Sequence, residues 1–357
     1  MFPVETKVFK LNTSTDHTNA IYEAATVLKN GGLVVFPTET VYGLGGDATN
    51  PDAAQAIYAA KGRPSDNPLI IHVADPADAE PYAVTCDAYY RLARHFMPGP
   101  LTVILPKKDT IPFSVTGGLD SVAVRCPSHP IARQLIQASG VPIAAPSANR
   151  SGRPSPTCAA HAIEDLCGHV DIILDGGDCE VGLESTIVKL EDNRGILLRP
   201  GAITPDDLRA VLTDLSIAPA VTAALAQGER VLSPGMKYRH YAPAAPLTLL
   251  EGKDEDVRAF LIRQAALPGV GILCFDEEIP LMPANASLFP VGARHDLETQ
   301  AHRLFAALRD ADAAPHIEKL YAHLPPMEGL GLALYNRAIR AAAHTIVHID
   351  PCVPKID

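Results

Sequence analysis

Short apolar runs that alternate with helix-like segments constrain the fold of this chain more than any other feature. Between about residues 15 and 205 the runs are "LVVFP", "PLIIHVA", "PLTVILP", "SVAVRCP", "VPIAAPS", "VDIILDGG", "STIVKLE" and "GILLRPG". Segments before and between them, such as "TNAIYEAATVLKN" and "HPIARQLIQASG", carry apolar residues at helical spacing and stop at glycine. Many short strands with intervening helices predict an α/β or α+β domain.

The pattern changes beyond residue 205. The segment "PDDLRAVL" predicts a helix, and "ALAQGERVLSPGMKYRHYAPAAP" (224–246) then shows little periodicity, as expected of an inter-domain connection. Strands at "LTLLEG" and "GVGILCF", with helices at "LETQAHRLFAALRDADAA" and "YNRAIRAAAH", predict a second, small α/β domain. We therefore expect domains at 1–205 and 246–357, joined by a linker at 206–245, as the length of 357 residues also favours.

Composition limits the classes of partner. Hydrophobic residues make up 47% of the chain and charged residues 20%, which is typical of a globular protein with a core. The net charge of −11 argues against a broadly basic nucleic-acid surface, and the absence of Trp leaves little for stacking on single strands. Seven unpaired-looking Cys, no export signal and no apolar run of about 20 residues predict a cytoplasmic protein with free thiols.

Several common site motifs are missing from the sequence. There is no phosphate loop of the G-x-x-x-x-G-K-[ST] type, no G-x-S-x-G elbow and no Cys/His cluster at zinc spacing. Gly43, Gly45 and Ala48 match G-x-G-x-x-A, but "PTETVY" separates them from the preceding strand. A dinucleotide site needs that turn to be tight, so we do not predict one here.

Polar segments lie beside five of the predicted strands, and together they suggest one pocket. The cations in and around these segments are Lys61, Arg63, Arg125, Arg150, Arg153 and Arg199. In a net-acidic chain they favour an anionic small ligand, because Arg forks suit phosphate and carboxylate, and Ser147, Asn149 and Ser155 add neutral donors. Each Arg taken alone is equally well explained as a surface or structural ion pair, and "AKGRPSDNPL" (60–69) as a solvated turn.

Seven motifs, in order, resemble the YrdC-like family: "FPTETVYGLG", "KGRPSDNPL", "PGPLTVIL", "VAVRCPSHP", "PIAAPSANRSGRPSPT", "GLESTIV" and "LLRPG". With the linker "SPGMKYRHYAP" (233–243) and the small domain after it, the chain is similar to the long, two-domain form of the threonylcarbamoyl-AMP synthase family. The resemblance implies a twisted mixed sheet flanked by helices in a catalytic domain at 1–205, a linker that also serves as a lid, and a small Rossmann-like α/β domain.

The resemblance also implies an activity. Members of the family are nucleotidyltransferases that convert L-threonine, bicarbonate and ATP, accompanied by Mg²⁺, to L-threonylcarbamoyl-AMP and pyrophosphate. The threonylcarbamoyl group then passes, through the tRNA threonylcarbamoyl-transferase machinery, to adenosine 37 of tRNAs that read ANN codons. A weak contact with tRNA is compatible with this role, and no membrane is involved. Two alternatives are an RNA-binding module without turnover and a regulatory ATP-binding domain.

Residue roles follow from the resemblance, motif by motif. Lys61, Arg63, Ser147 and Asn149 are the implied catalytic residues. The implied ATP site consists of these four with Ser121, Ser155, Arg199, Tyr238 and His240. The implied L-threonine site consists of Thr38, His72, Arg125, Ala145 (through its backbone) and Ser185. No side chain is implied as a metal ligand, and the linker is either a lid over the nucleotide or a plain tether.

Overall fold

The computed structural model describes residues 4–11, 17–191, 194–223, 241–314 and 316–350. Its contacts divide the chain into two compact units, one formed by residues 1–151 and 155–238 and the other by residues 152–154 and 239–357. Within the described ranges, no helix combines the length and apolar character needed to cross a membrane.

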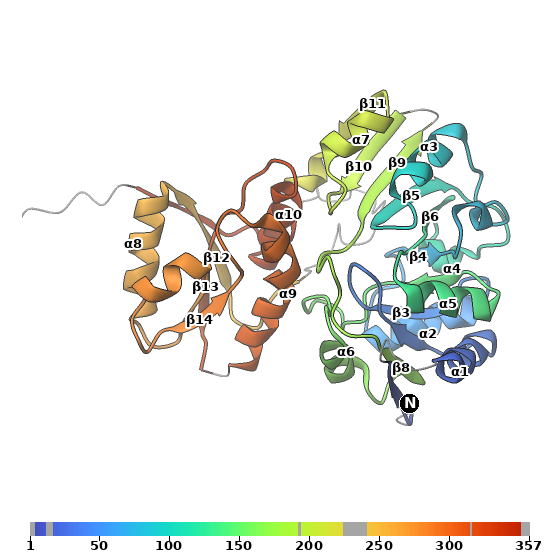
Figure 1. Cartoon of the computed structure of the whole chain (residues 1–357), viewed down its shortest axis with the longest axis horizontal. Coiled ribbons are helices and arrows are strands. Elements are labelled where there is room, and N and C mark those ends of the chain that lie inside the picture. The colour runs from blue at the N-terminus through green and yellow to red at the C-terminus, as the bar shows by residue number, and fades with distance from the viewer. Residues whose placement is uncertain (1–3, 12–16, 192–193, 224–240, 315, 351–357) are drawn as a thin grey trace, which may run out of the picture. The chain divides into compact units, whose positions relative to one another are not determined.

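An eleven-stranded mixed sheet forms the centre of the first unit, counted over the described residues (Figure 1). Its order is β1-β8-β2-β3-β7-β4-β6-β5-β9-β10-β11, with parallel and antiparallel neighbours. The strands are β1 Lys7–Lys10, β2 Val34–Phe36, β3 Gly43–Asp47, β4 Ile70–His72, β5 Leu101–Pro106, β6 Ser121–Arg125, β7 Ile143–Ala145, β8 Ile172–Asp175, β9 Thr186–Glu191, β10 Arg194–Arg199 and β11 Asp214–Ile217.

Helices cover both faces of this sheet. Because successive strand residues point to opposite faces, Val34 and Phe36 pack with α1 and α5, while Val35 packs in the core shared by α2, α3 and α6. The helices are α1 Thr18–Lys29, α2 Pro51–Lys61, α3 Asp87–Phe96, α4 Phe113–Thr116, α5 Pro130–Ser139, α6 Ala159–Leu166 and α7 Pro205–Val211, with 3₁₀ turns at Pro76–Ala79 and Pro219–Val221. The mixed α/β prediction is therefore confirmed.

Helix α2 has clear signals at both ends, and its end positions the site. Asn50 accepts a hydrogen bond from the backbone N–H of Asp52, and Pro51 occupies the first turn. The helix stops at Gly62, whose φ of 62° is readily adopted only by glycine. Lys61 is consequently the last helical residue, and Arg63 begins the loop that follows.

Strand β3 is absent from the sequence prediction, because three of its five residues are glycines, which weaken a strand. The neighbouring strands explain them. A Cβ at Gly45 would lie 2.6 Å from a methyl carbon of Ile143 and 2.8 Å from the ring of Phe36. These glycines allow close packing in the middle of a sheet and do not form a nucleotide-binding turn.

The segment expected to be a linker, 206–245, is partly ordered structure of the first unit. Helix α7 occupies residues 205–211, and β11 pairs in parallel with β10. Thr204 starts α7 with a capping box that it forms with Asp207. Of the predicted lid, residues 233–240 lie outside the described residues, so that prediction stays untested.

Over the residues that the structure describes, the second unit has a five-stranded, fully parallel sheet in the order β14-β13-β15-β12-β16. Helix α8 lies on one face, and α9 and α10 lie on the other (Figure 1). The elements are β12 Leu247–Gly252, α8 Asp254–Ala265, β13 Val270–Cys274, a 3₁₀ turn at Asp276–Leu281, β14 Ser287–Pro290, α9 Leu297–Ala313, β15 Lys319–His323, α10 Gly331–Ala341 and β16 Ile346–Ile349. The predicted Rossmann-like α/β character is confirmed.

Candidate active site

A row of three polar residues crosses the middle of the first sheet. His72 of β4 is level with Arg125 of β6, and Arg125 is level with Thr102 of β5. All three are buried, and they share a sheet face with a small apolar cluster that includes Ile70 and Ala123. Polar side chains in such a place are expensive unless each has a partner.

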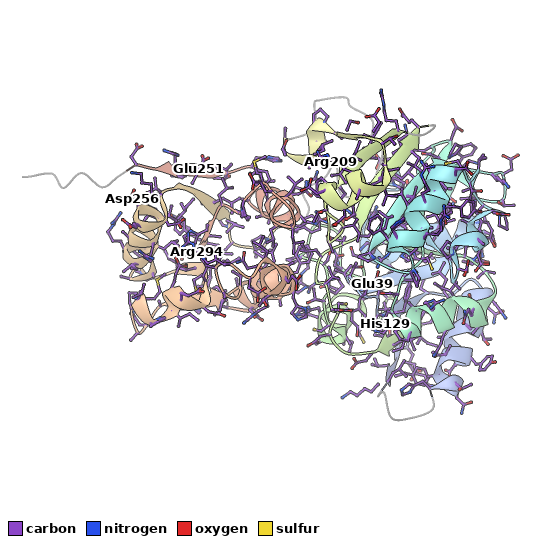
Figure 2. The ribbon with its side chains drawn as sticks, turned by 45° about the horizontal axis from the view of Figure 1, so that its top comes forward. Glu39, His129, Arg209, Glu251, Asp256 and Arg294 are labelled. Carbon is purple, nitrogen blue, oxygen red and sulfur yellow. The ribbon has the colours of Figure 1, made fainter. Side chains whose placement is uncertain are left out.

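Arg125 and Glu39 form a buried ion pair. A guanidinium nitrogen of Arg125 lies 2.7 Å from a carboxylate oxygen of Glu39 and 3.4 Å from the Thr38 hydroxyl. The second oxygen of Glu39 accepts the backbone N–H of Ser128 at 3.2 Å. His129 lies near Glu39 (Figure 2), and burial lowers its pKa, against the opposing charge of Glu39.

His72 is neutral at physiological pH. Burial, and then the charge of Arg125, lower its pKa to about 3. Its Nδ1 lies 3.2 Å from the carbonyl oxygens of both Ile70 and Ile143, which requires the hydrogen to be on Nδ1. Nε2 is then an acceptor, able to receive a hydrogen bond from a hydroxyl or an ammonium group.

Ser185 is held by two neighbours. Its hydroxyl lies 2.7 Å from the Thr102 hydroxyl, and Arg199 donates to its carbonyl oxygen at 3.0 Å and to its hydroxyl at 3.1 Å. Arg199 was predicted to bind nucleotide and Ser185 to bind threonine. The structure places these two side chains together, next to the row formed by His72, Arg125 and Thr102.

A second cluster forms around Lys61. Its ammonium group is buried and donates to the carbonyl oxygens of Ser147, at 2.5 Å, and of Asn149. The Ser147 hydroxyl donates to the side-chain oxygen of Asn149 at 2.5 Å. Three of the four implied catalytic residues are thus in direct contact. A buried lysine that donates to protein carbonyl oxygens rules out the solvated-turn interpretation for this position.

The remaining predicted residues surround these clusters. Arg63 donates to the carbonyl oxygens of Asn67, at 3.3 Å, and Pro68, at 3.0 Å, and so shapes the loop after α2. Ser155 is buried and donates to a carboxylate oxygen of Glu184. Thr38 donates to the carbonyl of Val41 at 2.6 Å. Two residues of the predicted ATP site, Tyr238 and His240, lie outside the described residues.

Strand register separates the two predicted sites. Ala145 of β7 and Ala123 of β6 are level with Ile70, one on each side of β4. Ser147 follows Ala145 by two residues and Ser121 precedes Ala123 by two, so both lie toward the amino end of β4. His72 and Arg125 lie at its carboxyl end. The register therefore places Ser121 and Ser147, implied for ATP, at one end of β4, and His72 and Arg125, implied for threonine, at the other end. Ala145 lies between them. Arg199 is the exception, because it was implied for ATP but contacts Ser185.

Three site residues were quoted in the sequence motifs without being given a role: Glu39, Thr102 and Glu184. Each is buried and contacts a predicted residue. The sequence feature that could have identified them is a charged or hydroxyl side chain inside or beside an apolar strand, where burial requires a hydrogen-bond partner. Among the described residues, no group of three or more His, Cys, Asp or Glu side chains is arranged to hold a metal ion.

Comparison with known proteins extends over both units. Residues 26–201 match the family described as Telomere recombination, and residues 203–343 match the family described as Threonylcarbamoyl-AMP synthase, C-terminal domain. The Threonylcarbamoyl-AMP synthase of Bacillus subtilis (strain 168) is 44% identical over 331 residues, which are 92% of this chain and 94% of that protein.

A relative from Pyrococcus abyssi is similar over nearly the same share of the chain. The Threonylcarbamoyl-AMP synthase of Pyrococcus abyssi is 41% identical over 337 residues, which are 91% of this chain and 95% of that protein. The crystal structure of P. abyssi Sua5 complexed with L-threonine has 40% sequence identity and a TM-score of 0.89, covering 96% of this chain and 100% of the other. The motifs, the two-unit fold and these relatives together show that this chain belongs to the threonylcarbamoyl-AMP synthase family.

Proposed function

We propose that this chain converts L-threonine, bicarbonate and ATP to L-threonylcarbamoyl-AMP and pyrophosphate, as a nucleotidyltransferase in the first step of threonylcarbamoyladenosine formation at position 37 of tRNA. The observation that carries the proposal is the division of buried polar residues between the two ends of β4. One end offers an Arg with a neutral His, and the other offers a Lys with hydroxyl and amide groups. A small amino acid and a triphosphate need such different surroundings.

At the carboxyl end of β4, Arg125 would bind the threonine carboxylate through its guanidinium fork. Glu39 already neutralises this arginine, so it would either share the guanidinium with the substrate or bind the substrate's ammonium group. His72 would accept a hydrogen bond at Nε2, and Ser185, oriented by Arg199, would bind the threonine hydroxyl. Thr38 and the backbone of Ala145 complete this proposed site.

At the amino end of β4, Lys61 and Arg63 would face the phosphates of ATP, with Ser147 and Asn149 as neutral donors. Ser121, on the other side of β4, would extend the nucleotide site across the sheet. We propose that Mg²⁺ comes with ATP, held by its phosphate oxygens, and supplies charge neutralisation there. Lys61 also fixes the loop that carries Ser147 and Asn149, so its role combines charge with positioning.

The reaction itself asks for positioning more than for covalent catalysis. The threonine amine first adds to carbon dioxide derived from bicarbonate, releasing a proton and forming a carbamate. A carbamate oxygen then attacks the α-phosphorus of ATP, and pyrophosphate leaves with the bond's electron pair. The two groups of residues are close together, with Ala145 between them. The carbamate would therefore be formed next to the phosphate that it attacks.

The decisive experiment is incubation of the full chain with ATP, L-threonine and ¹³C-bicarbonate, followed by mass spectrometry. We expect labelled threonylcarbamoyl-AMP and pyrophosphate only when all three substrates are present. Hydrolysis of ATP to AMP without the labelled adduct would contradict the proposal. So would stable tRNA binding without any nucleotide product, which would support the RNA-binding alternative instead.

A further inference from the structure

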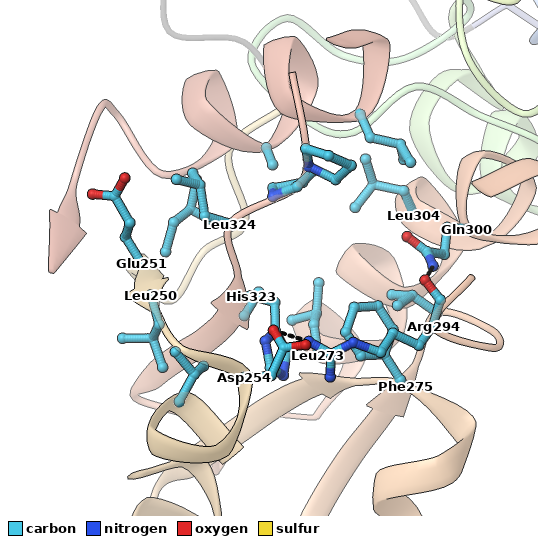
Figure 3. Close-up of a pocket in the computed structure, with 18 of the residues that line it drawn as sticks. Leu250, Glu251, Asp254, Leu273, Phe275, Arg294, Gln300, Leu304, His323 and Leu324 are labelled. Carbon is cyan, nitrogen blue, oxygen red and sulfur yellow. Dashed lines mark hydrogen bonds and ion pairs between the residues drawn. The ribbon is translucent and has the colours of Figure 1, made fainter. Parts of the chain in front are cut away.

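The second unit contains a cavity of about 450 Å³ at the carboxyl ends of two neighbouring strands, β12 and β15 (Figure 3). Its size is within the range of pockets that hold small organic molecules, about 300–1,000 Å³. All of its lining residues belong to this unit, so it is separate from the residues discussed above.

The topology of the sheet places this cavity where ligands bind in open parallel sheets. After β12 the chain enters α8, on one face, and after β15 it enters α10, on the other. Since β12 and β15 are adjacent, their following connections diverge and leave a crevice between them. Such a switch point, outside the carboxyl ends of the strands, is the general ligand position in this architecture.

Most of the cavity wall is aliphatic. Leu249 and Leu273 come from the strands, Leu304 from α9, and Leu334 and Ala338 from α10. These aliphatic side chains offer no charge and no hydrogen bond to a ligand. The part of the ligand that enters here must therefore be apolar.

Four polar lining residues, Asp254, Arg294, Gln300 and His323, lie along one side of the cavity, and another, Glu251, lies away from them (Figure 3). The guanidinium carbon of Arg294 lies 5.2 Å from the centre of the Phe275 ring, and Arg294 forms an ion pair with Asp254. His323 stacks on Phe275 at 4.8 Å, and its Nε2 bonds Glu278 at 2.8 Å. On this side of the cavity, one cation and one anion thus lie next to each other, and the ring of Phe275 packs against Arg294 and His323.

Two polar lining side chains, His323 and Gln300, are held in place by hydrogen bonds. Burial by itself would raise the pKa of Glu278, but the hydrogen bond and charge of His323 and the backbone N–H of Phe275 lower it, so the carboxylate anchors His323. Gln300 donates from its amide nitrogen to the carbonyls of Ala293, at 2.7 Å, and Arg294, at 2.9 Å. This bonding directs its amide oxygen toward the open centre of the pocket (Figure 3).

A nucleotide does not suit this crevice. In doubly wound folds the phosphates lie on the amino end of the helix after the first strand. Here the first turn of that helix, α8, carries Asp254, Glu255 and Asp256. Three carboxylates at this position would repel phosphate, and the connection "EGKD" is not a glycine-rich loop.

We propose that the cavity binds a free α-amino acid with an aliphatic side chain. Its carboxylate would pair with Arg294, and its ammonium group with Asp254 and the amide oxygen of Gln300. Its side chain would lie against Leu304 and Leu334. A zwitterion satisfies both members of the existing ion pair at once, whereas a simple anion or cation would leave one of them without its partner.

The test uses the full chain and photo-leucine, a diazirine analogue of leucine, with L-threonine at saturation to occupy the proposed substrate site. We expect light-dependent labelling of peptides within 294–304 and 322–338, mapped by mass spectrometry. L-leucine should compete at least ten times more effectively than 4-methylpentanoate, which lacks the ammonium group, or 3-methylbutylamine, which lacks the carboxylate. Labelling confined to the first unit, or equal competition by 4-methylpentanoate, would overturn the proposal.

Calorimetry of L-leucine binding to variants identifies the cavity independently. We expect Arg294→Gln to weaken binding at least ten-fold, and Arg263→Gln, which removes an exposed cation of α8 outside the cavity, to leave it unchanged. Ala338→Phe should abolish binding by filling the space. Unchanged affinity in Arg294→Gln, or in an Ala338→Phe protein that melts as the parent does, would show that the cavity is not the site. Adenylate synthesis, measured on the same samples, reports the proposed function separately.

Discussion

The two sheets of this protein present polar side chains in different ways. In the parallel sheet of the second unit, all strands point the same way, so the residues that follow them meet at one edge and surround a cavity. In the mixed sheet of the first unit, β7 runs opposite to β4 and β6. Residues after β7 therefore lie at one end of β4, and residues at the ends of β4 and β6 lie at the other.

This difference affects how the position of a site can be predicted from the polar residues that follow the strands. A parallel sheet collects polar loop residues at the carboxyl ends of its strands, whereas a mixed sheet divides them between its two ends. The row His72, Arg125 and Thr102 lies at one of these ends, the carboxyl end of β4, and is made by side chains within strands. Two chemically different groups of polar residues at the two ends of one short strand are a consequence of opposite strand directions.

Breaking the buried ion pair should have the largest effect. We expect Arg125→Met to lower the free energy of unfolding by about 3–5 kcal/mol, because Glu39 is left buried without its partner. Urea denaturation measures this. The double variant Arg125→Met with Glu39→Gln should recover much of the stability but no synthesis of the adenylate. A stable, active Arg125→Met protein would exclude this arginine from the threonine subsite.

The other end of β4 is probed by Lys61→Ala. If Lys61 contacts the phosphates as proposed, loss of a charge-assisted contact worth about 1.5–3 kcal/mol predicts a rate of pyrophosphate release roughly 10- to 150-fold lower. Lys7→Ala, which removes an exposed lysine paired with Glu23, is the matched control and should be fully active. If both variants released pyrophosphate at the parent rate, the lysine cluster would not be the phosphate subsite.

His72 should leave a signature in acid. Its folded pKa of about 3 lies below the ordinary value of 6.5, so between these pH values the unfolded chain binds a proton that the native protein does not. Stability is fully present above pH 6.5 and falls as the pH decreases, by at most about 1.4 kcal/mol per pH unit. We expect His72→Gln to reduce this slope near pH 5 by about one proton, measured from urea midpoints across pH. If the free energy of unfolding changed with pH equally in both proteins, the pKa of His72 would not be lowered by burial as expected.

A surface ion pair should show the smallest effect. Arg209, on α7, pairs at 2.8 Å with Asp206 three residues earlier, and both side chains are exposed (Figure 2). We expect Arg209→Ala to change the free energy of unfolding by no more than about 0.5 kcal/mol. Thermal or urea denaturation beside Arg125→Met would then compare a surface pair with a buried one. A loss of several kcal/mol would mean that α7 depends on this contact.

Local signals account well for the elements that the sequence predicts. The helix at 51–61 has a cap, a proline in its first turn and a glycine stop, and each acts over a few residues. Strand β3 was missed because its glycines are required by close packing against Ile143 and Phe36, which lie on neighbouring strands and cannot be identified from the local sequence. The cavity of the second unit was missed for the same kind of reason, since Asp254, Arg294 and His323 come from separate parts of the chain.

The sequence by itself determined the alternation of strands and helices, the cations and hydroxyls beside the strands, and the motifs that resemble one family. Propensity, capping and periodicity are properties of neighbouring residues, so they can be read along the chain. Only the tertiary structure decided that Lys61 contacts Ser147 and Asn149, that Glu39 neutralises Arg125, and that Arg199 lies with Ser185. Strand direction and register arise from pairing between segments that are distant in the sequence. A buried charge without a partner is unfavourable, so burial favours the arrangement in which each charged side chain has one.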